Sequence, residues 1–273
     1  MDYKIILSDL DGTLLDSCGK ISKQNFDAIE KLFDLGVDFV PASGRTLCEM
    51  PKQLVDNDNI RYIIYSNGAV VYDKLTKQKI TFGIPNDIKN ELVDLFKNSD
   101  CHVLIRFDGK SYVDKFKQSE QDFEYYSVNP EHKGVVIDYA TYCDDFITVC
   151  KEAQDVEVIS VFFKNLEDKQ KCKQLIEKSP ELGCADIYTH NVEIFAKSAG
   201  KGNALLALCQ KLNIDKDLSI AVGDSDNDKD MLQKAGLGLV PSNAPDVIKN
   251  VGDKVICSND EHIAQYILNN YIV

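Results

Sequence analysis

The sequence lacks the patterns of a zinc protein, a membrane protein and a secreted protein. Its nine cysteines include no C-x-x-C pair, and its four histidines lie far apart, at His102, His132, His190 and His262. Zinc sites usually bring such residues together at short spacings, so we expect no zinc site. No apolar run approaches the roughly 18 residues that cross a bilayer, and the segment MDYKIILSDLDG lacks the basic and apolar regions of a leader peptide. We therefore expect a cytoplasmic protein with reduced thiols.

Positive charge is also scarce. The chain has 31 Lys+Arg against 44 Asp+Glu, a formal net charge of −13. Such an acidic surface repels nucleic acid and anionic membranes, so we expect neither as a partner. It repels phosphate esters as well, so a site for a phosphorylated substrate needs cations placed locally.

The two ends of the chain share one pattern, in which short apolar runs alternate with segments of helical periodicity. This alternation predicts a Rossmann-like, doubly wound parallel sheet. The expected strands are Tyr3–Ser8, Val37–Ala42, Tyr62–Tyr65, Leu218–Val222, 237–240 and 254–257. One expected helix ends at Gly36 and another begins at Lys201. Three more are expected at 227–235, 245–250 and 260–270.

The middle of the chain changes character and mixes helices with strands that do not alternate regularly. Helices are expected at 86–98, 141–154 and 167–178, and strands at 101–107, 111–114, 156–163, 184–188 and 191–195. The Asp108-Gly109 dipeptide predicts a type I′ hairpin turn. We therefore expect a discontinuous core domain, residues 1–82 and 196–273, with an inserted α+β cap domain at 83–195.

The first cluster with chemical potential is Asp9-Leu10-Asp11-Gly12-Thr13, directly after the first strand. Ligands of open parallel sheets bind beyond the carboxyl ends of strands, so both carboxylates should face a crevice. One can attack as a nucleophile while the other gives and takes protons. Gly12 allows a sharp turn with N–H groups close to a phosphate. A plain polar turn is the alternative interpretation.

A second acidic cluster, Gly223–Asp228, follows the strand 218–222. Its carboxylates suit a hard cation bound by oxygen. Three of them match positions 1, 3 and 5 of a calcium loop, but Lys229 replaces the glycine of position 6 and Ala235 the glutamate of position 12. A calcium loop is therefore excluded, and a helix start capped by acids is the remaining structural alternative.

Two further segments offer hydrogen-bond donors. The hydroxyl of Ser43 and the N–H of Gly44 could donate to phosphate, and Arg45 could bind phosphate or pair with a nearby acid. Lys201 opens a helix, where its charge opposes the helix dipole. That cost is explained if the ammonium and the helix end both face a phosphate. A solvated surface lysine is the alternative.

Taken in order, the motifs DLDGT, SGR, the lysine of GKGNALLAL, and GDSDNDKDML resemble the haloacid dehalogenase-like hydrolase superfamily, specifically its Cof-type (subfamily IIB) phosphatases with a large inserted cap. The resemblance runs nearly end to end and includes SNGA at 66–69 and NAP at 243–245. Ser43 stands where threonine is common, which keeps the hydroxyl, and NDEH at 259–262 lacks a frequent glycine.

The resemblance implies a Mg²⁺-dependent phosphatase that hydrolyses small phosphorylated metabolites, such as sugar phosphates, through an aspartyl-phosphate. Asp9 would accept the phosphoryl group and bind Mg²⁺, while Asp11 would act as acid and base and bind the metal through its carbonyl. Asp224 would be the third protein ligand, supported by Asp228. The implied phosphate contacts come from Leu10, Ser43, Gly44, Lys201 and Asn227.

Other activities use the same residues. Asp11 argues against dehalogenation, because the dehalogenases of the superfamily lack an acid at that position. A phosphosugar mutase would retain the phosphorylated intermediate, and a phosphometabolite-binding regulator would bind without turnover, which the intact Asp9–Asp11 pair disfavours. Nothing in the sequence indicates the substrate or an oligomeric state. Polar residues of the expected cap strands could reach a sugar but are typical of ordinary surface: His102, Arg106, Tyr112, His190 and Glu193.

Overall fold

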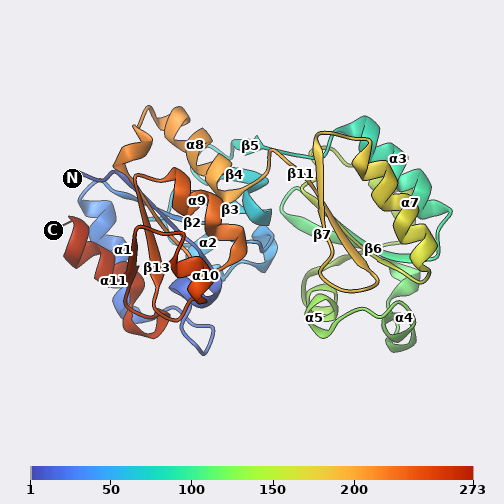
Figure 1. Cartoon of the computed structure of the whole chain (residues 1–273), viewed down its shortest axis with the longest axis horizontal. Coiled ribbons are helices and arrows are strands. Elements are labelled where there is room, and N and C mark those ends of the chain that lie inside the picture. The colour runs from blue at the N-terminus through green and yellow to red at the C-terminus, as the bar shows by residue number, and fades with distance from the viewer. Residues whose placement is uncertain (1, 273) are drawn as a thin grey trace. The chain divides into compact units, whose positions relative to one another are not determined.

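The computed structural model describes residues 2–272, and the contacts within the chain divide it into two compact units (Figure 1). The first unit comprises 1–44, 50–80 and 200–273, and the second comprises 45–49 and 81–199. The expected core and cap domains stay a prediction, but segment 45–49, which we expect in the core, lies in the second unit. It groups with the second unit because the Glu49 carboxylate accepts a hydrogen bond from the Ser111 hydroxyl at 3.1 Å.

The first unit is built on a parallel sheet in the order β14-β13-β12-β1-β2. Its strands are β1 (Ile5–Ser8), β2 (Asp38–Pro41), β12 (Ser219–Val222), β13 (Leu237–Pro241) and β14 (Lys254–Ile256). Every residue of β1 and β12 is buried, as expected of parallel strands covered on both faces. The prediction of a parallel sheet with flanking helices is confirmed.

Helices cover this sheet. They are α1 (Lys23–Asp34), α2 (Lys52–Val55), α8 (Lys201–Leu212), α9 (Lys229–Lys234), α10 (Asp246–Lys249) and α11 (Ile263–Ile267). Leu205 of α8 and Leu232 of α9 belong to the same buried cluster as Ile5 and Leu7 of β1. The α1 and α11 helices pack side by side (Figure 1).

A small second sheet, which sequence analysis identified only in part, extends the first unit. It contains β3 (Tyr62–Tyr65), β4 (Val70–Asp73) and β5 (Lys79–Thr81). Ala42, just beyond β2, forms a parallel bridge with Ile64. This bridge brings the segment after β2 beside the segment after β3.

The second unit contains a sheet in the order β10-β11-β9-β6-β7-β8. Its strands are β6 (Cys101–Phe107), β7 (Lys110–Asp114), β8 (Thr141–Cys143), β9 (Val158–Phe163), β10 (Leu182–Ala185) and β11 (Asn191–Ala196). Asp108 and Gly109 join β6 to β7 with φ values of 51° and 70°. Two positive φ values define the type I′ turn, so that prediction is confirmed.

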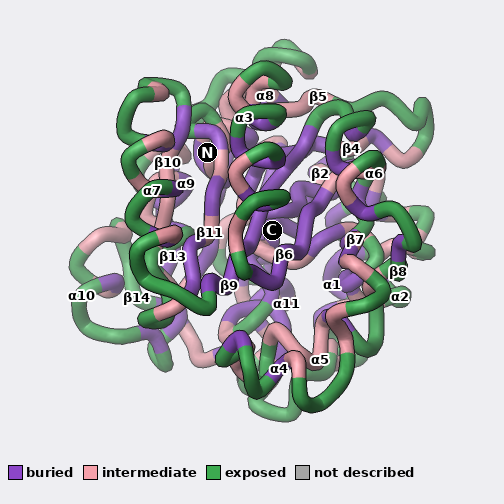
Figure 2. Tube along the Cα trace, turned by 90° about the vertical axis from the view of Figure 1, so that its right-hand side faces the viewer, coloured by how far each residue is buried: buried purple, intermediate pink, exposed green. Residues whose placement is uncertain are grey.

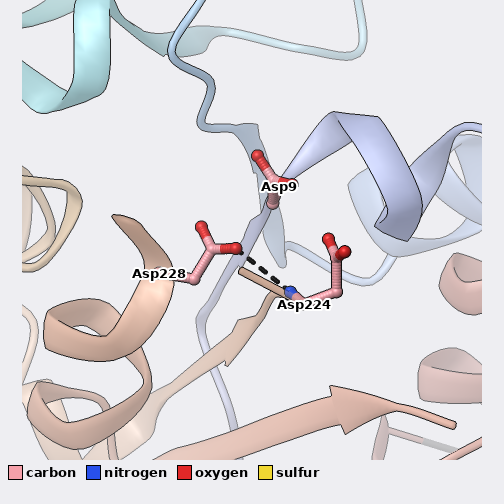
Figure 3. Close-up of side chains that lie close together, drawn as sticks. All are labelled: Asp9, Asp224 and Asp228. Atoms are coloured by element: carbon pink, nitrogen blue, oxygen red, sulfur yellow. Dashed lines mark hydrogen bonds between the residues drawn. The ribbon is translucent and has the colours of Figure 1, made fainter. Parts of the chain in front are cut away.

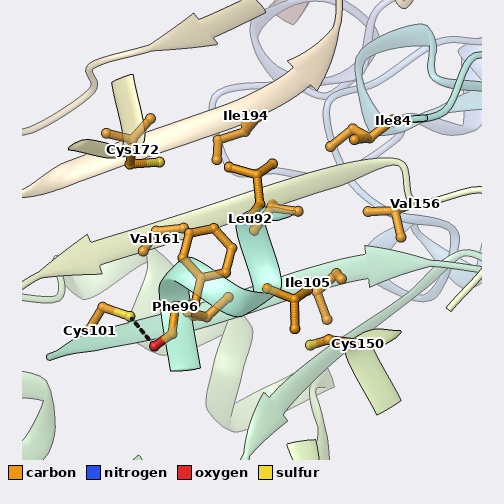
Figure 4. Packing of buried hydrophobic residues seen from close by; sticks show 14 of the residues in the cluster. Ile84, Leu92, Phe96, Cys101, Ile105, Cys150, Val156, Val161, Cys172 and Ile194 are labelled. Atoms are coloured by element: carbon orange, nitrogen blue, oxygen red, sulfur yellow. Dashed lines mark hydrogen bonds between the residues drawn. The ribbon is translucent and has the colours of Figure 1, made fainter. Parts of the chain in front are cut away.

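The helices α3 (Asn86–Lys97), α6 (Phe146–Glu152) and α7 (Leu166–Glu177) cover one face of this sheet. Their apolar residues pack on odd-numbered positions of β6 and β9 (Figure 4). Figure 2 shows β6 and β9 almost entirely buried. The helices α4 (Glu120–Tyr125) and α5 (Pro130–Tyr139) contribute Phe123 and Val136 to a smaller cluster that includes Leu104. No helix among residues 2–272 is long and apolar enough to cross a membrane.

Two predictions of elements in the second unit are wrong. The helix expected at 141–154 is a strand followed by α6, because the Asp145 side chain accepts a hydrogen bond from the Thr148 N–H and so starts the helix there. The strand expected at 184–188 already ends at Ala185. Sequence analysis did not predict α4 or α5.

Candidate active site

The register of the parallel sheet brings the two acidic clusters together. Ser8 at the end of β1 lies beside Val222 at the end of β12. The N–H of Asp9 continues the ladder by donating to the Val222 carbonyl at 2.9 Å. Asp9 and Asp224 therefore follow neighbouring strand ends, and Figure 3 shows them facing a common space with Asp228.

Lys201, the first residue of α8, completes this cluster. Its ammonium donates to Asp9 Oδ1 at 2.5 Å and to Asp228 Oδ1 at 2.6 Å. Lys201 and Asp228 are 0% exposed and Asp9 is 4% exposed. The alternative that Lys201 is a solvated surface lysine is therefore wrong.

Burial and charge act in opposite directions on these groups. Burial raises the pKa of Asp9 to about 7, although Lys201 opposes the rise. Burial would lower the pKa of Lys201, but the carboxylates of Asp9 and Asp228 raise it above its usual value. Lys201 is thus the fixed cation of the cluster, and Asp9 is the carboxylate whose charge responds to what binds beside it.

Asp228 holds the loop that carries Asp224. Its Oδ2 accepts hydrogen bonds from the backbone N–H groups of Asp224 and Ser225, each at 3.0 Å. Its other oxygen accepts from Lys201. Asp228 therefore connects the cation of the cluster to the Asp224 loop, and the dashed line in Figure 3 marks one of these bonds.

The turn after Asp9 positions Asp224 from the opposite side. The Thr13 hydroxyl donates to Asp224 Oδ1 at 2.9 Å. Gly12 has a φ of +79°, and a Cβ there would lie 2.4 Å from Asp224 Oδ2, so both the turn and the close approach require glycine. The Asn243 amide donates to the Gly12 carbonyl at 2.8 Å. Asp11, between these anchors, is exposed.

The donor set of this cluster suits a divalent cation. Carboxylate oxygens of Asp9, Asp224 and Asp228 lie within 4.8 Å of one another. Three carboxylates and the single ammonium of Lys201 give a formal charge of −3 + 1 = −2, so a divalent ion balances the cluster. Hard cations such as Mg²⁺ prefer oxygen ligands of this kind.

A second group forms around Asn67, which sequence reasoning did not include in the site. The Asn67 N–H donates to the Ser43 carbonyl at 3.0 Å, and its side-chain oxygen accepts from the Asn227 amide at 2.9 Å. A Cβ on Gly44 would lie 2.8 Å from that same oxygen. Asn67 thus joins three of the predicted phosphate-binding residues, Ser43, Gly44 and Asn227.

The turn at Ser66–Gly68 also contacts the start of α8. Ser66, Asn67 and Gly68 all have positive φ values, and a Cβ on Gly68 would lie 2.2 Å from the Gly200 carbonyl carbon. The SNGA segment is part of the family resemblance, but its long-range contacts leave no local signal in the sequence. Of the other predicted residues, Leu10 is fully buried and Arg45 donates to the Glu49 carbonyl at 3.3 Å.

Comparison with known proteins shows which family the chain belongs to. The family model described as haloacid dehalogenase-like hydrolase matches residues 6–267. The phosphatase YwpJ of Bacillus subtilis is 27% identical over 98% of this chain and 100% of its own length. The same organism's YwtE, named 5-amino-6-(5-phospho-D-ribitylamino)uracil phosphatase, is 26% identical over 98% of both chains. The solved structure of BT4131, called a subclass IIB sugar phosphatase, shares the fold with a TM-score of 0.74, at 19% identity over 99% of this chain and 100% of its own.

Proposed function

The chain belongs to the family of haloacid dehalogenase-like hydrolases and is a phosphatase, and from that premise we propose that it hydrolyses small phosphomonoesters with Mg²⁺, using Asp9 as the nucleophile. The observation that carries the proposal is the buried contact of Lys201 with Asp9 and Asp228, beside Asp224. Phosphoryl transfer depends mainly on positioning and on neutralising spread-out negative charge. In a chain of net charge −13, Lys201 together with a bound Mg²⁺ would supply that neutralisation locally.

In the first step, a carboxylate oxygen of Asp9 forms a bond to phosphorus while the ester P–O bond breaks. The leaving alkoxide takes the proton of Asp11. In the second step, Asp11 takes a proton from a water molecule whose oxygen bonds to the same phosphorus, and the bond between phosphorus and Asp9 breaks. Phosphate leaves, and both aspartates return to their starting states. Lys201 faces Asp9 throughout and offsets the charge that gathers there.

Asp9, Asp224 and the carbonyl of Asp11 would hold Mg²⁺. Both oxygens of Asp228 already accept hydrogen bonds, which supports a positioning role for this residue. When bound, Mg²⁺ supplies positive charge to the phosphate oxygens. The remaining phosphate contacts would come from Leu10, Ser43, Gly44, Lys201 and Asn227.

For the substrate we propose phosphorylated sugars or polyols. The name of YwtE, which includes a phosphorylated ribityl chain, supports this class. We also propose that the insert, residues 83–195, acts as a cap that selects the part of the substrate beyond its phosphate. The free state of all nine cysteines supports a reducing, cytoplasmic location.

The experiment is a screen of phosphorylated sugars and polyols for phosphate release, with Mg²⁺ and with excess chelator. We expect release with Mg²⁺, loss on chelation, and poor substitution by Ca²⁺, whose looser coordination misplaces the Asp9 oxygen.

A matched pair of loop variants tests the metal ligands. Asp224→Asn should raise the Mg²⁺ concentration needed for half-maximal activity at least about tenfold. Replacing a residue that only hydrogen-bonds to a metal ligand typically weakens metal binding by about 10–100-fold, and replacing a ligand itself should cost at least as much. Asp226→Asn is the control, because that exposed carboxylate pairs with Lys229. Full phosphate release in excess chelator contradicts the Mg²⁺ assignment.

A further inference from the structure

The second unit contains a cavity of about 200 Å³ on the sheet face opposite to α3, α6 and α7. Side chains alternate across a strand, so the face of a residue follows from its position. Ile105 of β6 and Val161 of β9 enter the core shown in Figure 4. Their neighbours Arg106 and Phe162 therefore point to the opposite face, where they line the cavity.

The charges in this cavity disfavour an anion. Arg106 is 8% exposed, and its guanidinium lies 3.7 Å from the carboxylates of both Glu49 and Glu193. These three side chains have a formal charge of +1 − 2 = −1, and among residues 2–272 the acidic group that could hold a metal ion lies elsewhere, at Asp9, Asp224 and Asp228. The cavity therefore does not attract a phosphate. No lysine lines the cavity among the described residues, whereas Glu131 and Glu193 do.

Three buried polar atoms that belong to residues lining this cavity have no hydrogen-bond partner among residues 2–272. They are Arg106 Nε, Asn191 Oδ1 and His132 Nε2. Burial lowers the pKa of His132 well below its usual value, so its imidazole is neutral. A buried polar group without a partner is destabilising, so a ligand that both donates and accepts hydrogen bonds would stabilise this site.

The rest of the lining is largely apolar or aromatic, with Val135, Phe162, Ile187 and Tyr188, and contacts between side chains hold it in place. The rings of Phe162 and His132 pack against each other at 4.7 Å between centroids. The Asn129 amide donates to the Tyr188 hydroxyl at 3.3 Å, and the Lys169 ammonium donates to the Thr189 carbonyl at 2.7 Å. These contacts hold α5 and the 187–190 loop at the edges of the cavity and leave aromatic surface inside it.

We propose that this cavity binds a neutral, polyhydroxylated ligand about the size of one sugar ring. Hydroxyl groups donate and accept at once, so they match the guanidinium N–H, the amide oxygen and the imidazole nitrogen together. The C–H faces of such a ligand can pack on Phe162, as apolar walls with a few polar groups usually do. The ligand is either a free polyol or the non-phosphate part of a substrate. Only the second possibility rests on the function proposed above.

The first test is calorimetric titration of the intact protein with myo-inositol and D-mannitol, and with sodium sulfate as a small polar anion. We expect one or both polyols to bind with millimolar Kd and sulfate not to compete. Asn191→Ala and Glu193→Gln should each weaken polyol binding at least about tenfold, a change of about 1.4 kcal/mol. Glu152→Gln, exposed on α6 and not part of the cavity, should leave it unchanged.

Thermal unfolding of each variant checks that a loss of binding is not a loss of fold, and Glu193→Gln retains a polar side chain of similar shape in case Asn191→Ala does not fold. The absence of saturable binding of either polyol below 100 mM, which is roughly where a binding free energy falls to 1–2 kcal/mol, overturns the proposal. Equal polyol binding by wild type and both folded variants overturns it too.

A kinetic arm distinguishes the two sources of the ligand. If the cavity holds part of the substrate, Glu193→Gln raises KM for a phosphorylated polyol at least about tenfold and leaves 4-nitrophenyl phosphate unaffected. If it holds a free polyol, both substrates keep their KM although polyol binding is lost. If the wild type hydrolyses neither substrate, the proposed function fails, while the calorimetry still decides whether the cavity binds polyols.

Discussion

Replacing the proposed nucleophile should stop the reaction and stabilise the metal-free protein at the same time. In Asp9→Asn, the amide oxygen can still accept from Lys201, but the amide cannot attack phosphorus. Burial raises the Asp9 pKa from 3.8 to about 7. A protonated Asp9 therefore contributes stability that is fully present below pH 3.8 and is lost as the pH rises through 7.

The size of this effect follows from the shift. The rise from 3.8 to about 7, at about 1.36 kcal/mol per unit of pKa, means that ionising Asp9 in the folded protein costs on the order of 4 kcal/mol at pH 8. Asparagine carries no charge at any of these pH values, so the variant should be more stable than wild type by a similar amount at pH 8 and by much less at pH 5. The lost charge-assisted bond to Lys201 reduces the gain somewhat.

Urea unfolding of both proteins in chelator at pH 5, 6, 7 and 8 measures the difference. The gap should grow with pH and level off above pH 7. Added Mg²⁺ should narrow it, because the cation binds the ionised wild-type site more tightly than the variant. A variant that is less stable than wild type at pH 8, or a gap that does not change with pH, would refute this electrostatic reasoning.

Three other predictions address different parts of the structure. Asp11→Asn should lower kcat about 10²–10⁴-fold with little change in stability, because proton transfer contributes that much and Asp11 is exposed; unchanged kcat in steady-state assays would contradict its role. Asn67→Ala should lower the free energy of unfolding in urea by about 1–2 kcal/mol and raise KM. It removes the hydrogen bond to Asn227 and places alanine at a φ of +54°, where a Cβ is unfavourable. Asn67→Gly should recover stability but not KM, and recovery of both would assign Asn67 a purely structural role. Burial lowers the pKa of His102 from 6.5 to about 4, so the contribution of its neutral imidazole to stability is present above pH 6.5, and about 2 kcal/mol of it is lost by pH 5. His102→Gln should flatten the dependence of unfolding free energy on pH between 5 and 6.5, and an unchanged slope would show that other groups cause it.

The parallel sheet and its acidic clusters were predictable because their signals are local. An apolar run followed by D-x-D-G, and another followed by G-D-S-D, place carboxylates at strand ends whatever the rest of the chain does. That Lys201 faces an anion could also be expected, since a lysine at a helix start is unfavourable unless an anion lies nearby. That its partners are Asp9 and Asp228 depends on the strand order, which local sequence does not specify.

What sequence analysis missed depends on contacts between distant segments. Asn67 gains its role from Ser43 and Asn227, and Glu49 joins the second unit through Ser111. The strand at 141–143 is only three residues long and lies next to a helix, so periodicity could not separate the two. The cavity beside Arg106 arises from three strands and a helix, and no single segment indicates it.

The central claim, that Asp9 carries the phosphoryl group, is tested most directly by trapping the intermediate. The enzyme is mixed with Mg²⁺ and a saturating substrate, quenched in acid within milliseconds, and reduced with borohydride, which converts an acyl phosphate of aspartate to homoserine. Peptide mass spectrometry then locates the modified residue. The account predicts homoserine at position 9 only when substrate is present, and none in Asp9→Asn. Rapid phosphate release with an unmodified Asp9 at every quench time, or homoserine at another aspartate, would contradict it.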